Sequence, residues 1–117
     1  MKVLLVLRSF PYENSRVQET VELALTLLAL EQQVDMLVLG KGILQLVVSQ
    51  EASSLGARAI PPLLDMVKWY GLGQLWIDQE ALKFVRSRGK RLLLEGNEVT
   101  QAQMAGLVRG YDLVLWA

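Results

Sequence analysis

The side chains that most often do chemistry in proteins are scarce in this sequence. Its 117 residues contain no cysteine and no histidine. The chain therefore cannot supply a thiol nucleophile, a metal site of cysteine and histidine ligands, or a Ser-His-Asp triad. We expect no catalytic residue, no metal and no cofactor. The remaining candidates are an arginine and serine near the N-terminus, a lysine between two glycines, and an aspartate after an apolar run.

The segment after the first apolar run could bind an anion. Arg8, Ser9, Asn14 and Ser15 would lie beside the N-terminus of a helix, whose free amides attract negative charge. The segment has no glycine, however, and Pro11 lacks an amide donor, so it matches neither a P-loop nor a dinucleotide-binding motif. The simpler interpretation is a capped helix start with a solvated arginine.

Asp78 directly follows the apolar segment Leu75-Trp76-Ile77. It could act as a general base, or as half of a metal site with Glu95. We favour a third interpretation, in which Asp78 is the N-cap of the following helix. Lys41, between two glycines, could bring a cation to the same region, although a lone lysine in a glycine turn is usually solvated.

Alternating elements must position these residues. Short apolar runs predict buried strands, and apolar residues at helical spacing predict helices. The predicted strands are 3–7, 34–39, 75–77, 92–94 and 113–116, and the predicted helices are 15–30, 61–71, 78–89 and 100–110. Ser15 with Gln18, and Thr100 with Gln103, have the spacing of capping boxes. Residues 43–48 fit either a short helix or extended chain.

This alternation predicts an α/β fold of the flavodoxin or Rossmann type. We expect three layers around a mostly parallel five-stranded sheet, in one domain over residues 1–117. Ligands of such folds bind at the carboxyl ends of the strands. The predicted edge positions are Arg8 to Ser15, Gly40 to Gly42, Asp78 and Gly96-Asn97.

Composition narrows the class of partner. Hydrophobic residues make up 52% of the chain and charged residues 21%, and the formal net charge is zero. A neutral chain has no electrostatic attraction for nucleic acid or for an anionic membrane, and little self-repulsion to oppose association. No apolar run reaches membrane-spanning length, and the N-terminal run lacks a cleavage site, so we expect a cytoplasmic protein. Trp69, Tyr70 and Trp116 are candidates for an interface.

Four segments resemble the motifs of one family. They are Phe10-Pro11-Tyr12, Gly42-Ile43-Leu44-Gln45-Leu46, Arg86-Ser87-Arg88-Gly89 and Tyr111-Asp112-Leu113-Val114-Leu115. They are similar to the Ala-Pro-Tyr loop, the Gly-Val-Phe-Gln-Leu segment, the Arg-x-Arg-Gly helix end and the Tyr-Asp-x-Val-Leu ending of DsrE/DsrF-like proteins. Their order and spacing extend over most of the chain. Within the family the chain looks most like the TusC/DsrF branch of the sulfur-relay complexes.

The resemblance implies a part in sulfur relay. TusC-like chains join TusB-like and TusD-like (DsrH/DsrE-like) chains in a heterohexamer that passes persulfide sulfur toward 2-thiolation of tRNA, and the related DsrEFH complex serves sulfur oxidation. The sulfur-carrying cysteine of the DsrE/TusD-type subunit lies just after the third strand, at or beside the position of Asp78 here. An aspartate cannot form a persulfide. The chain would then be a non-catalytic structural subunit that lacks the carrier cysteine.

The strand ends would, on this interpretation, hold ligand or interface positions rather than a catalytic site. These positions are Arg8, Ser9, Tyr12, Lys41 and Gly42. Two alternatives stay open. The chain could be a stand-alone homo-oligomeric DsrE-like protein that binds a small ligand near Arg8, Ser9 and Lys41. It could also be an enzyme that uses Asp78 and Glu95.

Overall fold

The computed structural model describes residues 1–9, 15–47, 70–92 and 94–117. Its strands are β1 (Lys2–Leu7), β2 (Gln33–Val38), β3 (Leu75–Asp78), β4 (Asn97–Val99) and β5 (Leu113–Trp116). Its helices are α1 (Arg16–Ala29), α3 (Gln79–Ser87) and α4 (Gln101–Arg109), with a 3-10 helix, η1, over Gly40–Leu46. Most of the helix predicted for 61–71 lies outside the described residues, as do Tyr12 and Trp69.

The five strands form one parallel sheet in the order β4-β3-β2-β1-β5. The predicted fold class, an α/β protein around a five-stranded parallel sheet, is confirmed. The strand order differs from the 2-1-3-4-5 order of flavodoxin. Successive strands step away from β1 as far as β4, and β5 then returns to the other side of β1.

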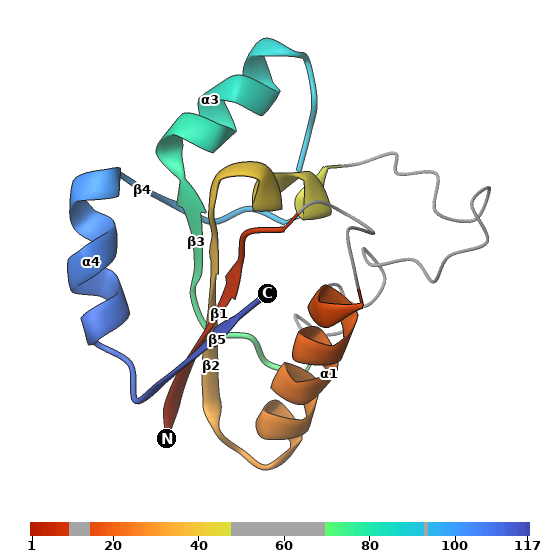
Figure 1. Ribbon diagram of the computed structural model, residues 1–117, viewed down its shortest axis with the longest axis vertical. Coiled ribbons are helices and arrows are strands. Elements are labelled where there is room, and N and C mark those ends of the chain that lie inside the picture. The colour runs from red at the N-terminus through yellow and green to blue at the C-terminus, as the bar shows by residue number, and fades with distance from the viewer. Residues whose placement is uncertain (10–14, 48–69, 93) are drawn as a thin grey trace.

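This strand order distributes the helices over both faces of the sheet. Right-handed crossovers place the helices of connections that step in one direction on one face, and the helix of the returning connection on the other. Accordingly α1, η1 and α3 pack with one cluster of buried residues, and α4 packs with a second cluster around Leu4, Val6 and Leu37. Figure 1 shows α1 and α4 on opposite sides of the strands.

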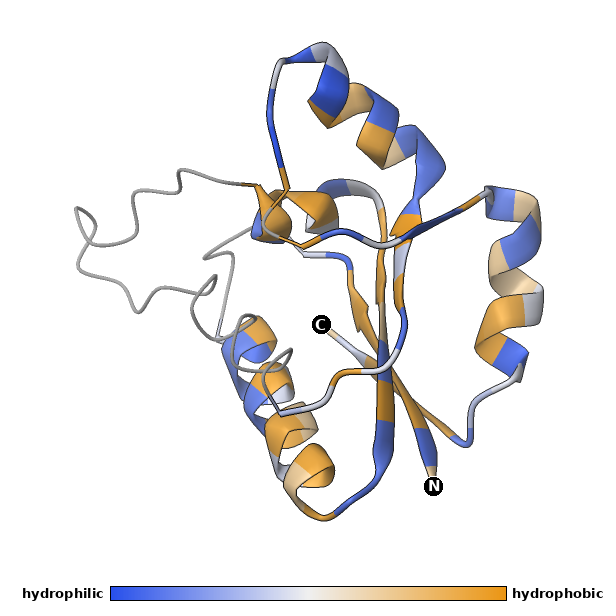
Figure 2. Cartoon of the chain, turned by 180° about the vertical axis from the view of Figure 1, so that it is seen from behind, coloured by the Kyte–Doolittle hydropathy of each residue, from blue (hydrophilic) through white to orange (hydrophobic). Residues whose placement is uncertain are grey.

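The core is centred on β1, which has a strand on each side and helices over both faces. Residues Val3 to Leu7 are fully buried, as the continuous apolar run predicts. Figure 2 shows the hydrophobic residues concentrated along the central strands and on the helix faces that turn toward them. The inner face predicted for α1 is confirmed at Val17, Val21 and Ala24, which are buried.

The hydrogen bonds at the first residues of the helices show which of the predicted caps are present. Asp78 is the N-cap of α3, where its side chain accepts a hydrogen bond from the Glu80 amide. The capping box of Thr100 and Gln103 is present at α4. The box predicted for Ser15 and Gln18 is wrong, because the Ser15 side chain makes no capping hydrogen bond.

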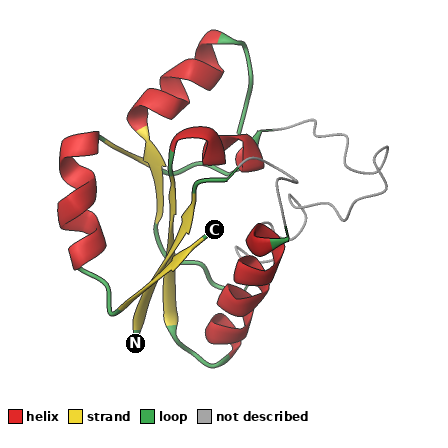
Figure 3. Cartoon of the chain, in the orientation of Figure 1, coloured by secondary structure: helices red, strands yellow, loops and turns green. Residues whose placement is uncertain are grey.

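The fourth strand is not where the sequence pattern predicts it. The sequence pattern predicts it over residues 92–94, but β4 is Asn97–Val99, and the described residues between α3 and β4 form no other strand or helix (Figure 3). Leu94 is buried against the core beside α3, and Leu92 makes one isolated antiparallel bridge with Val47. An apolar run indicates that the residues are buried, and burial alone does not distinguish a strand from a covered loop.

Candidate functional site

η1 follows β2 and contacts the carboxyl ends of both β1 and β3. Gly42 of η1 lies so close to β1 that a Cβ there would stand 2.1 Å from the carbonyl oxygen of Leu7. Further along η1, the Gln45 side chain donates to the backbone carbonyl of Ser9, 3.3 Å away. Only glycine permits the close approach of the η1 and β1 backbones at Gly42. The glycine of the Gly42-to-Leu46 motif therefore has a packing role at the edge of the sheet.

Asp78 ties the other end of η1 to β3. One carboxylate oxygen accepts from the Gly40 amide at 2.9 Å, and the other accepts from the Glu80 amide at 3.1 Å. Both oxygens are thus engaged by backbone donors of different elements. The geometry is that of a structural clamp between η1 and α3, and it confirms the N-cap interpretation of this residue.

A shallow groove runs between η1 and α3, next to this clamp. Its volume is about 460 Å³, and its lining includes the apolar residues Ile43, Leu44 and Phe84 and the charged residues Lys41, Asp78 and Glu80. Phe84 is 56% exposed, and the Arg88 guanidinium lies 5.1 Å from its ring centroid. An apolar groove with an exposed ring suits contact with another apolar surface better than a charged small molecule.

Arg8 directly follows β1, and its side chain lies over a residue of β5. Its guanidinium stands 4.8 Å from the ring centroid of Trp116, and its amide donates to the Ala117 carbonyl at 2.7 Å. The Arg8 side chain therefore lies toward β5, while its Cα lies beside Gly42 of η1, 2.8 Å from where a Cβ on that glycine would stand. Binding of one anion by Arg8 and Lys41 stays a prediction.

Glu95 and the Gly96-Asn97 segment do not share the carboxyl edge with Asp78. Asn97 pairs with Trp76 and Val99 pairs with Asp78, so Glu95 precedes β4 at the amino end of the strands. The prediction that Gly96 and Asn97 follow a strand is wrong, because it rested on a strand at 92–94. The pairing of Asp78 with Glu95 in an acid/base or metal site has no geometric support.

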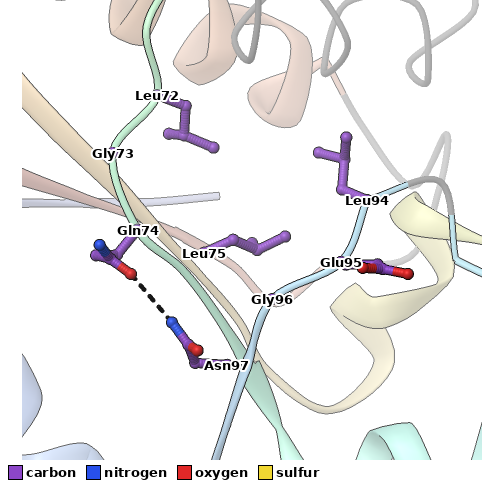
Figure 4. A pocket seen from close by; sticks show the side chains of 8 residues that line it. All are labelled: Leu72, Gly73, Gln74, Leu75, Leu94, Glu95, Gly96 and Asn97. Carbon is purple, nitrogen blue, oxygen red and sulfur yellow. Dashed lines mark hydrogen bonds between the residues drawn. The ribbon is translucent and has the colours of Figure 1, made fainter.

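Residues 95–97 instead help to line a cavity at the amino end of β3 and β4. Its volume is about 400 Å³, and Leu72, Leu75 and Leu94 contribute to its wall (Figure 4). The Asn97 amide donates to the side-chain oxygen of Gln74 at 3.0 Å. These contacts hold the start of β4 against β3.

Two buried polar groups escaped the sequence analysis. The Gln45 side-chain oxygen is fully buried and has no hydrogen-bond partner. Asp35, on β2, is buried and accepts from the Gln74 amide at 2.8 Å and from the Tyr111 hydroxyl at 2.5 Å. A charged residue inside the apolar run 34–39 was the available signal for Asp35, because a buried carboxylate requires partners.

Tyr111 carries a perturbed hydroxyl. Burial, followed by the hydrogen bond that it donates to Asp35, raises the pKa of Tyr111 to about 12. The Lys2 ammonium also lies 4.9 Å from its ring centroid. Tyr111 stands at the amino end of β5, so this network locks the start of β5 to β2 and is remote from the carboxyl edge.

Two searches of the described residues gave no further site. Over residues 1–9, 15–47, 70–92 and 94–117, no group of three or more acidic residues is arranged to hold a metal ion. No helix in that part of the chain is long and apolar enough to cross a membrane.

Fold and edge together define a three-layer α/β protein with a 4-3-2-1-5 parallel sheet and no thiol or imidazole of its own. The chain belongs to the DsrE/DsrF-like family, whose model matches residues 1–115. It is 24% identical over 101 residues to the "Protein TusC homolog" of Vibrio vulnificus (strain CMCP6), covering 86% of each chain. The crystal structure of the ychN protein from E. coli matches 99% of this chain, and 98% of that chain is covered, with a TM-score of 0.78 at 16% identity. The likeness to the ychN protein, at 16% identity, shows the fold alone.

Proposed function

We propose that this protein is a non-catalytic structural subunit of a sulfur-relay complex of the TusBCD/DsrEFH kind. Membership of the DsrE/DsrF-like family and the likeness to a TusC homolog support this class of function. The partners would be TusB-like and TusD-like chains, and the complex would work in the cytoplasm, in tRNA thiolation or in sulfur oxidation.

The observation that carries the proposal is the pair of backbone hydrogen bonds that Asp78 accepts at the end of β3. The resemblance assigns this place, or one immediately beside it, to the sulfur-carrying cysteine of the carrier subunits. Persulfide transfer needs a thiolate nucleophile, and this chain holds none. Asp78 uses both oxygens to bind the backbone of η1 and α3, so the position serves the architecture of the edge.

The groove between η1 and α3 is the surface that we assign to a partner subunit. It lies beside Asp78, is mostly apolar and carries the half-exposed ring of Phe84. Large apolar side chains at the centre of an interface supply much of its binding energy. Through this surface the chain would shape the neighbouring subunit's site without taking part in the chemistry.

Co-expression tests the proposal. The tagged chain is produced with TusB-like and TusD-like chains, and the captured material is analysed by size-exclusion chromatography with light scattering. We expect a stable complex that contains all three chains. Phe84→Asp should weaken capture, whereas Leu23→Asp, at a comparably exposed position on α1 (45%), should not. A chain that stays monomeric and captures neither partner would contradict the assignment.

A second function, small-ligand binding by a stand-alone DsrE-like protein, is favoured by one observation. The buried Gln45 oxygen lacks a donor, and the same side chain bonds to Ser9 at the carboxyl edge. Calorimetric titration with inorganic phosphate and with adenosine monophosphate tests this function. Binding that is lost in both Gln45→Leu and Arg8→Ala would support it, and no binding of either compound would count against it.

A further inference from the structure

Another cavity lies between α3 and the loop that leads from it to β4. Its volume is about 520 Å³, which falls within the range of small-molecule sites, about 300–1,000 Å³. Three of the residues that line it, Ile77, Leu82 and Leu94, belong to the core and are 2%, 3% and 4% exposed. The inner wall of the cavity is therefore apolar.

The outer wall is rich in positive charge. Arg86, Lys90 and Arg91 line the cavity and are exposed residues. Over the described part of the chain, none of these three side chains forms an ion pair. Glu95 is the one acidic residue among the described residues that line the cavity, so three positive charges stand against one negative charge. In a chain of zero net charge this is a local excess of positive charge.

A glycine turn brings these cations together. Gly89 has a φ of 69°, in the left-handed region that favours glycine. Its amide donates to the Arg86 carbonyl at 3.0 Å, and the Lys90 amide donates to the Val85 carbonyl at 3.1 Å. These two bonds form a Schellman motif, which ends the helix and reverses the chain. Figure 1 shows the loop running back from the end of α3 toward the sheet, so the residues after Gly89 share a cavity with the last turn of the helix.

The same turn engages carbonyl groups that would repel an anion. The last carbonyls of a helix carry partial negative charge. In α3, the carbonyls of Val85 and Arg86 accept the bonds of the turn. Further along the loop, Leu92 makes its bridge with Val47, and Leu94 is buried. The cations are therefore carried by a backbone that is fixed on both sides.

We propose that this cavity binds a small organic phosphate, with its apolar body on the inner wall and its phosphate group at the three cations. A phosphate monoester carries a charge of about −1.5 to −2 at pH 7, which matches the local excess of positive charge. The planar guanidinium of an arginine can donate two parallel hydrogen bonds to phosphate oxygens. The inference is independent of the sulfur-relay proposal, because it uses neither Asp78 nor the groove between η1 and α3.

Calorimetric titration of the full chain with octyl phosphate tests the class of ligand. Inorganic phosphate lacks the apolar body and octanol lacks the charge, so each should bind about tenfold or more weakly than octyl phosphate. Octyl phosphate binding should also weaken as the salt concentration rises, because the three cations are exposed. Equal affinities for octyl phosphate and octanol, or no binding of octyl phosphate, would overturn the proposal.

Substitutions in the outer wall test the place of binding. Arg91→Ser should weaken octyl phosphate binding about tenfold, and Arg91→Lys should recover part of the loss. Arg88→Ser is the matched control, because it removes the same charge from the same end of α3, but the Arg88 guanidinium lies at the Phe84 ring and the residue does not line the cavity. Circular dichroism checks that each variant is folded. Equal losses in Arg91→Ser and Arg88→Ser would show a general attraction between charges and would overturn the site.

Arg8→Ala separates this cavity from the small-ligand site considered at the carboxyl edge. It should leave octyl phosphate binding unchanged, since Arg8 is remote in sequence from α3 and does not line the cavity. Binding that is lost in Arg8→Ala and kept in Arg91→Ser would overturn the proposal.

A lipid headgroup carries the same phosphate chemistry, so the full chain is also sedimented with vesicles of phosphatidic acid in phosphatidylcholine. We expect the chain to stay in the supernatant, because its net charge is zero and the cavity has room for one small molecule from solution. Cosedimentation with these vesicles would assign the cations to a membrane surface and would overturn the proposal.

Discussion

Replacing Asp78 by alanine separates a structural role from a chemical one. The substitution removes the N-cap bond to the Glu80 amide and the bond to the Gly40 amide. Loss of the cap costs about 1 kcal/mol. The Gly40 bond adds about 1 kcal/mol, because that residue is exposed and water replaces part of the lost bond. We therefore expect the free energy of unfolding to fall by about 2 kcal/mol, which lowers the Tm by about 8 °C for a domain of this size.

Urea unfolding followed by circular dichroism measures this loss. Asp78→Ser, which keeps a capping oxygen but is too short to reach Gly40 as well, should recover about half of the 2 kcal/mol. Both variants should still capture partner chains at temperatures where they are folded. If Asp78→Ala unfolds at the same urea concentration as the parent but loses capture or any activity of the complex, the structural role argued from the two backbone bonds is refuted.

Three further predictions follow from the geometry. Gly42→Ala places a Cβ 2.1 Å from a β1 carbonyl oxygen, and it should lower the free energy of unfolding in urea by about 3 kcal/mol. The control Gly106→Ala has open space around the added atom and should stabilise α4 by about 0.5 kcal/mol. Equal effects of the two substitutions would contradict the packing role of Gly42. Tyr111→Phe should cost about 1–3 kcal/mol because it leaves a buried oxygen of Asp35 unpaired. The Tyr111 hydroxyl has a pKa of about 12 in the folded protein and 10.0 as its ordinary value, so its contribution to stability is present below pH 10.0 and is lost as pH rises toward 12. The difference in stability between parent and Tyr111→Phe should shrink over that pH range. A difference that stays constant would refute the role of the hydroxyl. Glu95→Gln should leave stability, metal content and partner capture unchanged. A loss of bound metal, measured by mass spectrometry, would instead support a metal site that includes Glu95.

Local patterns predicted the elements whose causes are local. The apolar run 3–7 is the buried β1, and the helical spacing of Val17, Val21 and Ala24 is the inner face of α1. Asp78 caps α3 because an N-cap needs only an oxygen and an amide two residues later. Each of these features depends on neighbours a few residues away along the chain.

The fourth strand and the partners of the buried polar groups could not be predicted in this way. Residues 92–94 are apolar because they cover the core beside α3, whereas the edge strand β4 needs few apolar side chains and has almost none. Asp35 and Tyr111 are 76 residues apart in sequence, and nothing local pairs them. The error in β4 displaced Glu95 from the amino to the carboxyl end of the sheet, and the predicted acidic pair depended on that error.

The sequence by itself determined what this protein lacks. A chain without cysteine or histidine cannot carry a persulfide or hold a histidine triad, whatever its fold, because composition does not depend on conformation. The tertiary structure alone decided which residues share an edge. It engaged both oxygens of Asp78 and placed Glu95 at the amino end of the strands, away from Asp78. Strand order brings together segments that are far apart in the sequence, so the spacing of residues within one segment does not specify it.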